Sequence, residues 1–315
     1  MKTTLPLISI VTVSFEARED IKRWLKWALD ETYPHKEILV FENGSGSDVL
    51  SELKKYEDLV KVIYHTQNIG KTPALNRVFS HCKGEAIFIL DQDATMQNGA
   101  LESLVVDLFA EERVGAIGPI VCHAEDPDHI WAAGTSVNMW NGRNTFYGYG
   151  LSYNAYSKES PRKAVSILPT AALIRSSVWR EIGGNDEDIF LVYCDSTLCH
   201  RILDKGYSIF CLHSARAYHF EPKGIGSLEK HGVNTKMRAF LVARNRALFI
   251  MRHGTVTQKI VYFLVFHPLY AIYYSFYFAT QKRWDLLGAY WKGMLSSILT
   301  HLNIERPIYD IIPLL

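Results

Sequence analysis

Residues 86–93 read AIFILDQD, an apolar run followed at once by two aspartates. The run from Ala86 to Leu90 is typical of a buried strand at the centre of a sheet. Asp91 and Asp93 leave the end of that strand two positions apart, so their carboxylates can converge on one hard cation. An isolated Asp-x-Asp is more often a polar turn. Its position after a buried strand favours a site for Mg²⁺ or Mn²⁺ that binds diphosphate oxygens.

On both sides of this stretch, from about residue 5 to residue 118, short β-branched runs alternate with helical patterns. This alternation predicts an α/β fold with a parallel sheet, right-handed crossovers and a ligand across the carboxyl ends of the strands. The expected strands are 7–13, 37–41, 60–64, 86–90 and 114–117, and the expected helices are 20–31, 49–56, 73–82 and 100–111.

The second half of the chain begins with residues 123–165, which are rich in Gly, Asn, Tyr and Ser and have little periodicity. We expect a loop or insertion there that covers a site. Order returns from Ser166 to His219, and beyond Gly232 the chain is expected to be helical and basic. The later strands are expected at 171–175, 208–212 and 215–218, and the later helices at 176–182 and 196–205.

Composition narrows the class of protein. The 315 residues are 48% hydrophobic and 21% charged, an ordinary globular balance that excludes a disordered or fibrous chain. The net charge of +1 provides no global field for nucleic acid, but residues 236–293 contain nine Lys and Arg against one acid. The five cysteines include no CxxC pair, so a reducing compartment is expected. The first residues, MKTTLPLISIVTV, indicate a strand without a cleavage site, and export is not expected.

Three further polar positions each have two interpretations. Glu42 begins a turn, ENGS, that is simple turn chemistry or a carboxylate that accepts an N–H from a pyrimidine. Asp195 begins a helix and is an N-cap or a general base kept ionised by the helix N-terminus. His219 is an ordinary histidine at a strand end or a third metal ligand.

Taken in order, these segments resemble the GT-A fold glycosyltransferases of family 2, particularly bacterial rhamnosyltransferase-like members of polysaccharide assembly. The resemblance covers roughly residues 5–255. The matching segments are SIVTVSF at 9–15, ENGS at 42–45, NIG at 68–70 with Ala74 and Asn76, DQD at 91–93, GGNDE at 183–187 through Asp195 and Arg201, His219 with Gly226-Ser227, and Arg244-Asn245.

The resemblance implies a Rossmann-like, mostly parallel sheet flanked by helices, with a C-terminal helical extension that associates with a membrane. It implies a catalytic domain at 1–232, divided into a nucleotide-binding half at 1–118 and an acceptor-side half at 119–232, and a basic, aromatic helical region at 233–315. The implied nucleotide-sugar contacts are Thr12, Ser14, Glu16, Glu42, Asn43, Asn68, Gly70, Lys71, Asn76, Asp91, Gln92 and Arg244.

The resemblance also assigns the reacting groups. Asp91, Asp93 and His219 are the implied ligands of Mn²⁺ or Mg²⁺, and Asp195 is the implied catalytic base of a single displacement that inverts the anomeric carbon. Thr170, Glu187 and Asp188 are placed on the acceptor side. The chain departs from the family at Cys194, where an acid is usual, so Asp195 alone is the base, with Glu187 and Asp188 as fallbacks. Lys71 also replaces a small or aromatic residue, and Glu42 a commoner Asp.

Residues 260–279 contain 17 apolar or aromatic residues of 20, enough to span a membrane on length alone. Five are Tyr, and His267-Pro268 interrupts the middle, which disfavours a span. Tyr and the flanking cations suit the headgroup layer of an anionic membrane, so an interfacial helical platform is the first expectation. A core or dimer-interface helix pair is the second, and a true span the third. The flanking cations are Arg252, Lys259, Lys282 and Arg283.

The sequence therefore predicts a metal-dependent inverting glycosyltransferase of surface polysaccharide synthesis, cytoplasmic and peripheral on the inner face of the cell membrane. The expected donor is dTDP-rhamnose first and a UDP-sugar second, and the acceptor is a glycan or a lipid-linked glycan. Two alternatives stay open. The first is nucleotidyl transfer onto a sugar phosphate, which requires a Gly-rich phosphate loop that residues 14–18 lack. The second is a non-catalytic membrane-associated scaffold, which would explain the missing acid at Cys194. A homodimer is also open, and nucleic acid is not an expected partner.

Overall fold

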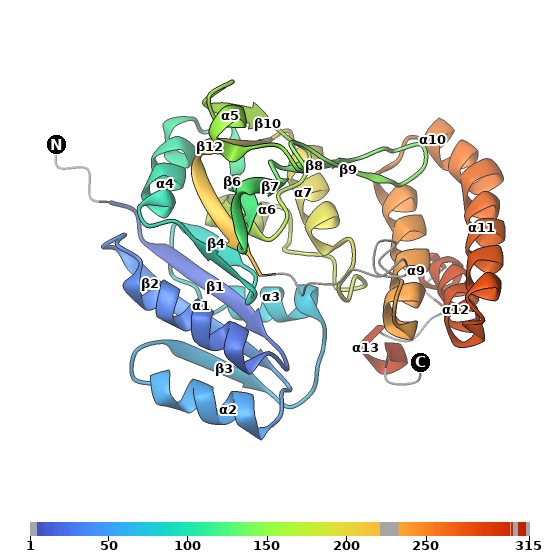
Figure 1. The fold of residues 1–315 in the computed structure, drawn as a ribbon, viewed down its shortest axis with the longest axis horizontal. Helices are drawn as coiled ribbons and strands as arrows, with labels where there is room; N and C mark the ends of the chain where they lie inside the picture. The colour runs from blue at the N-terminus through green and yellow to red at the C-terminus, as the bar shows by residue number, and fades with distance from the viewer. Residues whose placement is uncertain (1–4, 221–232, 303, 305–307, 313–315) are drawn as a thin grey trace. The chain divides into compact units, whose positions relative to one another are not determined.

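The computed structural model describes residues 5–220, 233–302, 304 and 308–312 of the chain, which forms two compact units (Figure 1). The first unit takes its described residues from Met1–Ser136, Phe146–Asn185 and Leu198–Glu221. The second takes them from Val137–Thr145, Asp186–Thr197 and Pro222–Leu315. The predicted domain boundary after residue 232 adjoins a range outside the described residues and stays a prediction.

The first unit is built on a mixed sheet of ten strands. Its strands are β1 (Ile8–Ser14), β2 (Lys36–Asn43), β3 (Lys61–His65), β4 (Ala86–Leu90), β5 (Ala94–Met96), β6 (Val114–His123), β7 (Asp126–Ala132), β10 (Arg162–Ala164), β11 (Ala171–Arg175) and β12 (Ser208–His219). The order across the sheet is β10-β12-β6-β11-β4-β1-β2-β3, with β5 paired to β12 and β7 to β6. Strands β8 (Thr135–Val137) and β9 (Asn144–Phe146) form a separate two-stranded sheet.

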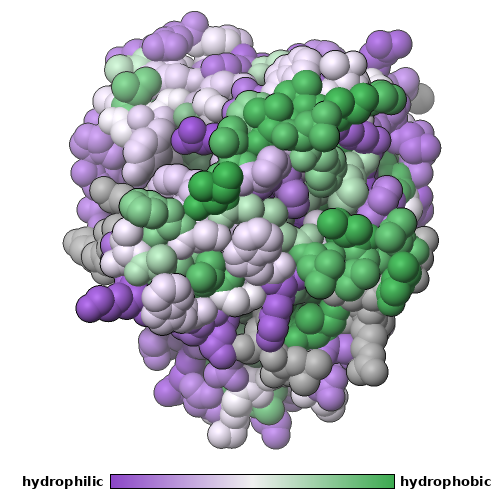
Figure 2. Space-filling view, turned by 90° about the vertical axis from the view of Figure 1, so that its right-hand side faces the viewer, coloured by the Kyte–Doolittle hydropathy of each residue, from purple (hydrophilic) through white to green (hydrophobic). Residues whose placement is uncertain are grey.

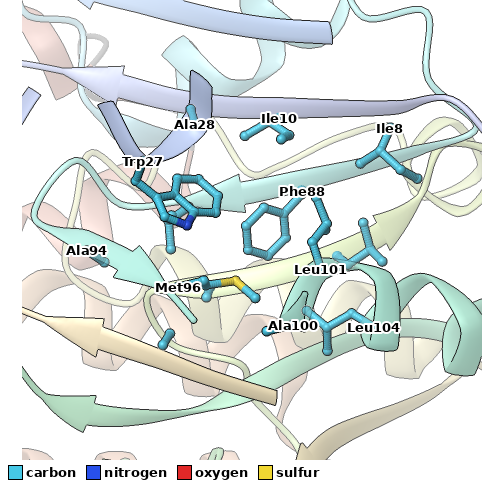
Figure 3. Close-up of a cluster of buried hydrophobic side chains, with 14 of the residues drawn as sticks. Ile8, Ile10, Trp27, Ala28, Phe88, Ala94, Met96, Ala100, Leu101 and Leu104 are labelled. Atoms are coloured by element: carbon cyan, nitrogen blue, oxygen red, sulfur yellow. The ribbon is translucent and has the colours of Figure 1, made fainter. Parts of the chain in front are cut away.

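Helices connect these strands and cover the sheet. They are α1 (Arg18–Asp30), α2 (Ser47–Leu53), the short 3₁₀ helix η1 (Lys54–Tyr56), α3 (Lys71–Phe79), α4 (Ala100–Ala110), α5 (Tyr153–Tyr156), α6 (Ser176–Glu181) and α7 (Cys194–Asp204). The apolar face predicted for α1 is confirmed, because Ile21, Trp24, Leu25 and Ala28 are all fully buried. Figure 3 shows Phe88 of β4 between Trp27 of α1 and Leu101 of α4 in this core.

Strand pairing confirms part of the predicted sheet and corrects the rest. The four strands β3-β2-β1-β4 are parallel, as expected. Beyond them β11 runs antiparallel between β4 and β6, so the strand predicted at 114–117 is not a neighbour of β4. The two strands predicted at 208–212 and 215–218 are the single strand β12, with a register irregularity between Leu212 and Arg216.

Residues 123–165, predicted as a loop or an insertion, are not a loop. This stretch contains β7, β8, β9, β10 and the short helix α5. Strands of three residues with exposed side chains, such as β9, leave no alternation of apolar and polar residues to detect. Only β7 is longer, and most of its side chains lie outside the core as well.

The second unit combines the short segments 137–145 and 186–197 with the chain beyond residue 232, which is helical in the part that the structure describes. Beyond residue 232 it contains α9 (Lys236–His253), α10 (Val256–Val261), the π-helical segment η2 (Tyr262–Phe266), α11 (His267–Thr280), α12 (Trp284–His301) and α13 (Ile308–Ile311). Phe240 of α9, Tyr274 and Phe278 of α11 and Tyr290 of α12 form its core. One helix of the described chain, Val256–Thr280, is long and apolar enough to cross a membrane. Of its most apolar 18-residue stretch, 17% is buried within the protein.

Two glycines of α12 differ in the space that surrounds them. A Cβ on Gly293 would lie 2.3 Å from the backbone oxygen of Phe240, so α9 and α12 approach each other too closely there for any side chain. A Cβ on Gly288, five residues earlier in the same helix, would meet nothing within 4 Å.

We therefore predict opposite effects of the same substitution at the two positions. Gly293→Ala forces the helices apart and is expected to lower the free energy of unfolding by about 1–3 kcal/mol. Gly288→Ala is expected to raise it by up to about 1 kcal/mol, because alanine is the better helix former. Equilibrium denaturation of both variants measures this, and equal effects at the two positions would contradict the close approach of α9 and α12.

Candidate active site

The carboxyl ends of β1 and β4 are joined by Gln92. The backbone N–H of Phe15 donates to Gln92 Oε1 at 3.0 Å, and Gln92 Nε2 donates to the Phe15 oxygen at 3.0 Å. The side-chain amide of Gln92, a predicted nucleotide contact, thus fixes the loop after β1 against the end of β4. Thr12 and Ser14, also predicted contacts, are fully buried within β1, and their hydroxyls have no hydrogen-bond partner among the described residues.

Glu42 and Glu16 organise the turn after β2. Glu42 is 1% exposed and accepts from the backbone N–H groups of Ser45 at 2.6 Å and Gly44 at 3.3 Å. Glu16 adopts a left-handed backbone with φ 50° and accepts from the N–H of Gly46 at 3.0 Å. Within the protein, therefore, Glu42 shows the turn chemistry that was one of its two interpretations, and its contact with a base stays a prediction.

Asn43 and Asn68 build the next turn, which precedes α3. Asn43 Nδ2 donates to Asn68 Oδ1 at 3.0 Å, and Asn43 Oδ1 accepts from the N–H of Ile69 at 3.0 Å. Asn68 Oδ1 also accepts from the N–H of Gly70, whose φ of +90° favours glycine. Lys71 follows as the first residue of α3. The side chains predicted in this segment therefore do lie together, and their hydrogen bonds fix the turn that leads to Lys71.

Lys71 meets the first aspartate of the DQD stretch. Its Nζ lies 2.6 Å from Asp91 Oδ1, with the two side chains 12% and 27% exposed. The backbone N–H of Asp91 donates to the oxygen of Thr170 at 2.9 Å. Thr170, a predicted acceptor-side residue, has φ 67° and is 6% exposed, and strained backbone of this kind is often found at functional sites.

Strand pairing brings Asp93 to His219. Ala94 of β5 pairs with His219 of β12, and the N–H of Phe220 donates to the backbone oxygen of Asp93 at 2.8 Å. Asp93 Oδ2 lies 3.3 Å from His219 Nε2. The other carboxylate oxygen, Oδ1, is buried and accepts no hydrogen bond from any residue that the structure describes.

The electrostatic surroundings keep Asp93 ionised. Burial alone would raise the pKa of its carboxyl, but the hydrogen bond and charge of His219, together with the charge of Lys71, lower the pKa below its usual value. On its other side the His219 ring meets Trp131 of β7 edge to face, with ring centroids 4.9 Å apart. Trp131 was not predicted, since it lies in the stretch expected to be a loop.

The donor atoms at this edge fit a divalent cation. A buried carboxylate oxygen without a hydrogen bond is costly unless something positive meets it, and oxygen and imidazole nitrogen both bind Mn²⁺. Among the described residues no three or more His, Cys, Asp or Glu side chains gather as metal ligands, and Asp91 contacts Lys71 instead. One or two carboxylates suffice where substrate phosphates complete the coordination. Asp93 and His219 would hold the ion, and the part of Asp91 stays a prediction.

Asn76 is used inside the first unit. Its Nδ2 donates to the backbone oxygen of Asn185 at 2.9 Å, and its Oδ1 accepts from the N–H of Asn185 at 2.7 Å. A Cβ on Gly184 would lie 2.6 Å from Asn76 Oδ1, which explains the glycine in the Gly183-Gly184 turn. This predicted nucleotide contact thus positions the end of the GGN segment.

The second unit contains the segment that leads to the predicted base. Asp195 lies in the first turn of α7, partly exposed, where the helix N-terminus favours its negative charge. Tyr193 just before it has φ 72° and donates its hydroxyl hydrogen to the oxygen of Gly142 at 2.5 Å. Glu187 is exposed. The predicted residues Gly226 and Ser227 lie outside the described residues.

Three side chains of α9 fasten this segment. Arg244 donates to the backbone oxygen of Asp188 at 2.7 Å, and Asn245 Nδ2 donates to the oxygen of Val192 at 2.6 Å. Arg252 bridges the carboxylates of Asp186 and Asp188. Arg252 was expected among the cations beside a membrane and pairs with these acids instead. Neither this pairing nor the role of α9 was predicted, because nothing in a basic helix tells which distant acids it will meet.

Arg244 is 1% exposed and has a second set of partners in α12. Its Nε donates to Ser296 Oγ at 3.0 Å and its Nη2 to Thr300 Oγ1 at 2.9 Å. With these bonds the guanidinium ties α12 to the Asp186–Thr197 segment. Its predicted contact with the nucleotide stays a prediction, and the structure gives it a positioning role instead.

Comparison with known proteins now identifies the family. The profile of Glycosyl transferase family 2 matches residues 9–183, more than half of the chain. The chain belongs to this family. Its sequence is 29% identical over 100 residues to the putative teichuronic acid biosynthesis glycosyltransferase TuaG of Bacillus subtilis. The match covers 31% of this chain and 40% of TuaG. The chain spans about half or less of the length of such relatives, for example 52% of the probable glycosyltransferase YdaM of Bacillus subtilis and 17% of the O-antigen biosynthesis protein RfbC of Myxococcus xanthus.

Solved structures confirm the GT-A fold of this member of family 2. GalNAc-T7 with UDP, GalNAc and Mn²⁺ superposes with a TM-score of 0.61 at 15% identity, over 82% of this chain and 54% of that one. The mannosyltransferase PcManGT from Pyrobaculum calidifontis, in complex with GDP-Man and Mn²⁺, gives 0.56 at 16% identity, over 98% and 78%. At such identities the likeness shows the fold alone.

The first prediction from this site concerns metal binding. Asp93→Asn removes the charge beside His219 and is expected to weaken the binding of Mn²⁺, measured by titration calorimetry with nucleoside diphosphate present, by at least about tenfold. The matched control is Asp126→Asn, which removes an exposed aspartate 2.8 Å from His129 and is expected to change nothing. Equal Mn²⁺ affinity in the Asp93 variant and the wild type would remove Asp93 as a ligand.

The second prediction concerns the segment before Asp195. Arg252→Met leaves Asp186, 13% exposed, without the cation that neutralises it, so the segment is expected to open more often. Hydrogen exchange at the Ile189 and Cys194 amides should speed up by at least about tenfold. Arg162→Met, which removes a similar bridge to Asp107 and Glu111 in the first unit, should leave these amides unchanged. If both variants or neither accelerate them, Arg252 does not fix the segment.

Proposed function

We propose that this family 2 glycosyltransferase moves a sugar from a nucleoside diphosphate onto a glycan or lipid-linked acceptor, with a divalent metal, in the synthesis of a surface polysaccharide or glycolipid. The observation that carries the proposal is the buried, uncommitted Asp93 oxygen beside His219 at the carboxyl edge of the sheet. In open α/β sheets this edge is where ligands bind. The teichuronic acid protein and the Mn²⁺ complexes among its relatives support the proposal.

On the donor side the chain's own charges suit a diphosphate. Lys71 is the first residue of α3, and its ammonium group contacts Asp91. The same flexible side chain can rotate to bind a phosphate oxygen. When bound, the metal would stabilise the negative charge that develops on the departing diphosphate. Asp93, ionised at neutral pH, and His219 are the groups that would position it, and Trp131 keeps the His219 ring in place.

On the acceptor side the proposed base is Asp195. A hydroxyl that attacks the anomeric carbon must lose its proton, and a carboxylate in the first turn of a helix, where the N-terminus favours negative charge, can accept it. Arg244, Asn245 and Arg252 fix the backbone of the segment that leads to it. A single displacement from the opposite face of the sugar inverts the anomeric configuration.

For the donor sugar and the location we propose the same order of candidates that the sequence predicts. The proposed donor is dTDP-rhamnose first and a UDP-sugar second, and the proposed location is the cytoplasmic face of the cell membrane. A panel of nucleotide sugars with Mn²⁺ tests this by the release of nucleoside diphosphate in the presence of a glycan acceptor. Release from dTDP-rhamnose is the expected result. Binding of donors without any release would favour the scaffold alternative.

The base assignment gives a separate prediction. Asp195→Asn is expected to lower transfer by about 10²–10⁴-fold while the thermal shift produced by donor and Mn²⁺ stays that of the wild type. Asp204→Asn removes an exposed acid at the other end of α7 and is the matched control, expected to keep full turnover. Glu187→Gln tests the fallback base: loss of turnover in this variant with retention in the Asp195 variant would transfer the role to Glu187.

A further inference from the structure

The outer side of the helix that runs from α10 through η2 to α11 is apolar. Six large side chains spaced three to five residues apart are exposed by 53% to 75%. This spacing places them on one face of the helix, over about 30 Å of its length. They are Val256, Ile260, Leu264, Leu269, Ile272 and Phe276.

Helix α12 adds a second row beside the first. The exposed residues of this row are Trp284, Trp291, Leu295, Ile298 and Leu302, between 47% and 64%. Trp291 Nε1 donates to Ser275 Oγ of α11 at 3.0 Å, and the rings of Tyr290 and Tyr274 lie 4.7 Å apart, so the two helices pack side by side. Together the two rows form what we call the outer apolar face. Figure 2 shows several hydrophobic patches on the side of the molecule that it views, with polar side chains between them.

The inner sides of the same helices combine the aromatic core with buried polar contacts. Arg246 of α9 lies with its guanidinium 4.2 Å from the ring centroid of Tyr270 in α11. Ser296 and Thr300 of α12 accept from the buried Arg244. If α11 crossed a bilayer while packed against α9 in this way, both arginines would enter the hydrocarbon with it, at a high cost. Docking of the outer apolar face in the plane of the membrane surface avoids this cost, which favours it over a span.

The charge around the face selects its partner. From residue 236 to residue 293 the sequence has nine Lys and Arg and a single acid, Asp285, which pairs with Arg283 at 2.8 Å. Three of the nine, Arg244, Arg246 and Arg252, make contacts within the second unit, and the other six remain to set the charge. A symmetric dimer through this face would place the basic segment against its own copy, which is unfavourable. An anionic bilayer attracts Lys259, Lys282 and Lys292, and Trp and Tyr prefer its headgroup layer.

We propose that the outer apolar face docks in the plane of an anionic lipid bilayer and enters it to the depth of its side chains. This names the surface by which the proposed function meets a membrane. The inference rests on the exposed side chains and their charge surroundings, so it stands or fails separately from sugar transfer.

The test is co-sedimentation of the purified full chain with vesicles of phosphatidylcholine, with and without phosphatidylglycerol. The wild type should bind the anionic vesicles, and more weakly at high salt. Leu264→Glu with Phe276→Glu should lower the binding constant by at least about a hundredfold, since two apolar anchors become charges. The matched control is Leu59→Glu with Val106→Glu, two first-unit positions 63% and 64% exposed, which should bind like the wild type.

Three results would overturn the proposal. The first is a wild type that stays in solution with anionic vesicles. The second is a dimer in light scattering that the Leu264/Phe276 variant converts to a monomer, because the face would then bind a second copy. The third is retention of the protein by cell membranes after alkaline carbonate washing, which indicates a span. Thermal unfolding of each variant, expected to match the wild type at these exposed positions, shows that lost binding is not lost folding.

Discussion

The pairing of β5 with β12 is the constraint on which the proposed chemistry depends. It pairs Ala94 with His219. Asp93, which lies just after β4, is thereby brought next to His219, the last residue of the last strand that the structure describes. Burial then leaves one Asp93 oxygen without a partner among the described residues, while His219 and Lys71 keep the carboxyl ionised. A three-residue strand thus turns two ordinary polar residues into a pair suited to a cation.

The second unit uses its basic helices in two different ways. On α9, Arg244 and Asn245 donate hydrogen bonds to the segment before Asp195 and Arg252 neutralises two of its acids, so these side chains hold the second unit together. On α10, α11 and α12 large apolar side chains are exposed, and the same stretch of sequence contains Lys259, Lys282 and Lys292. One basic, aromatic composition therefore supports both a positioning role and a surface for lipid.

The sequence predicted what local patterns determine. The apolar run before Asp91, the buried face of α1 and the order of the family 2 motifs were all readable from neighbouring residues. Contacts between distant residues were not, because no local pattern encodes them. Trp131 beside His219 and Arg252 beside Asp186 both come from the fold. The inward turn of Glu42 onto two backbone N–H groups likewise depends on a loop geometry that the sequence left open.

The most direct test of the central claim is a crystal structure with nucleoside diphosphate and Mn²⁺, with the metal located by its anomalous scattering. The account predicts a manganese peak within about 2.2 Å of an Asp93 carboxylate oxygen, bridging to the diphosphate. A diphosphate bound at the carboxyl edge of the sheet with its manganese away from both Asp93 and His219 would contradict it.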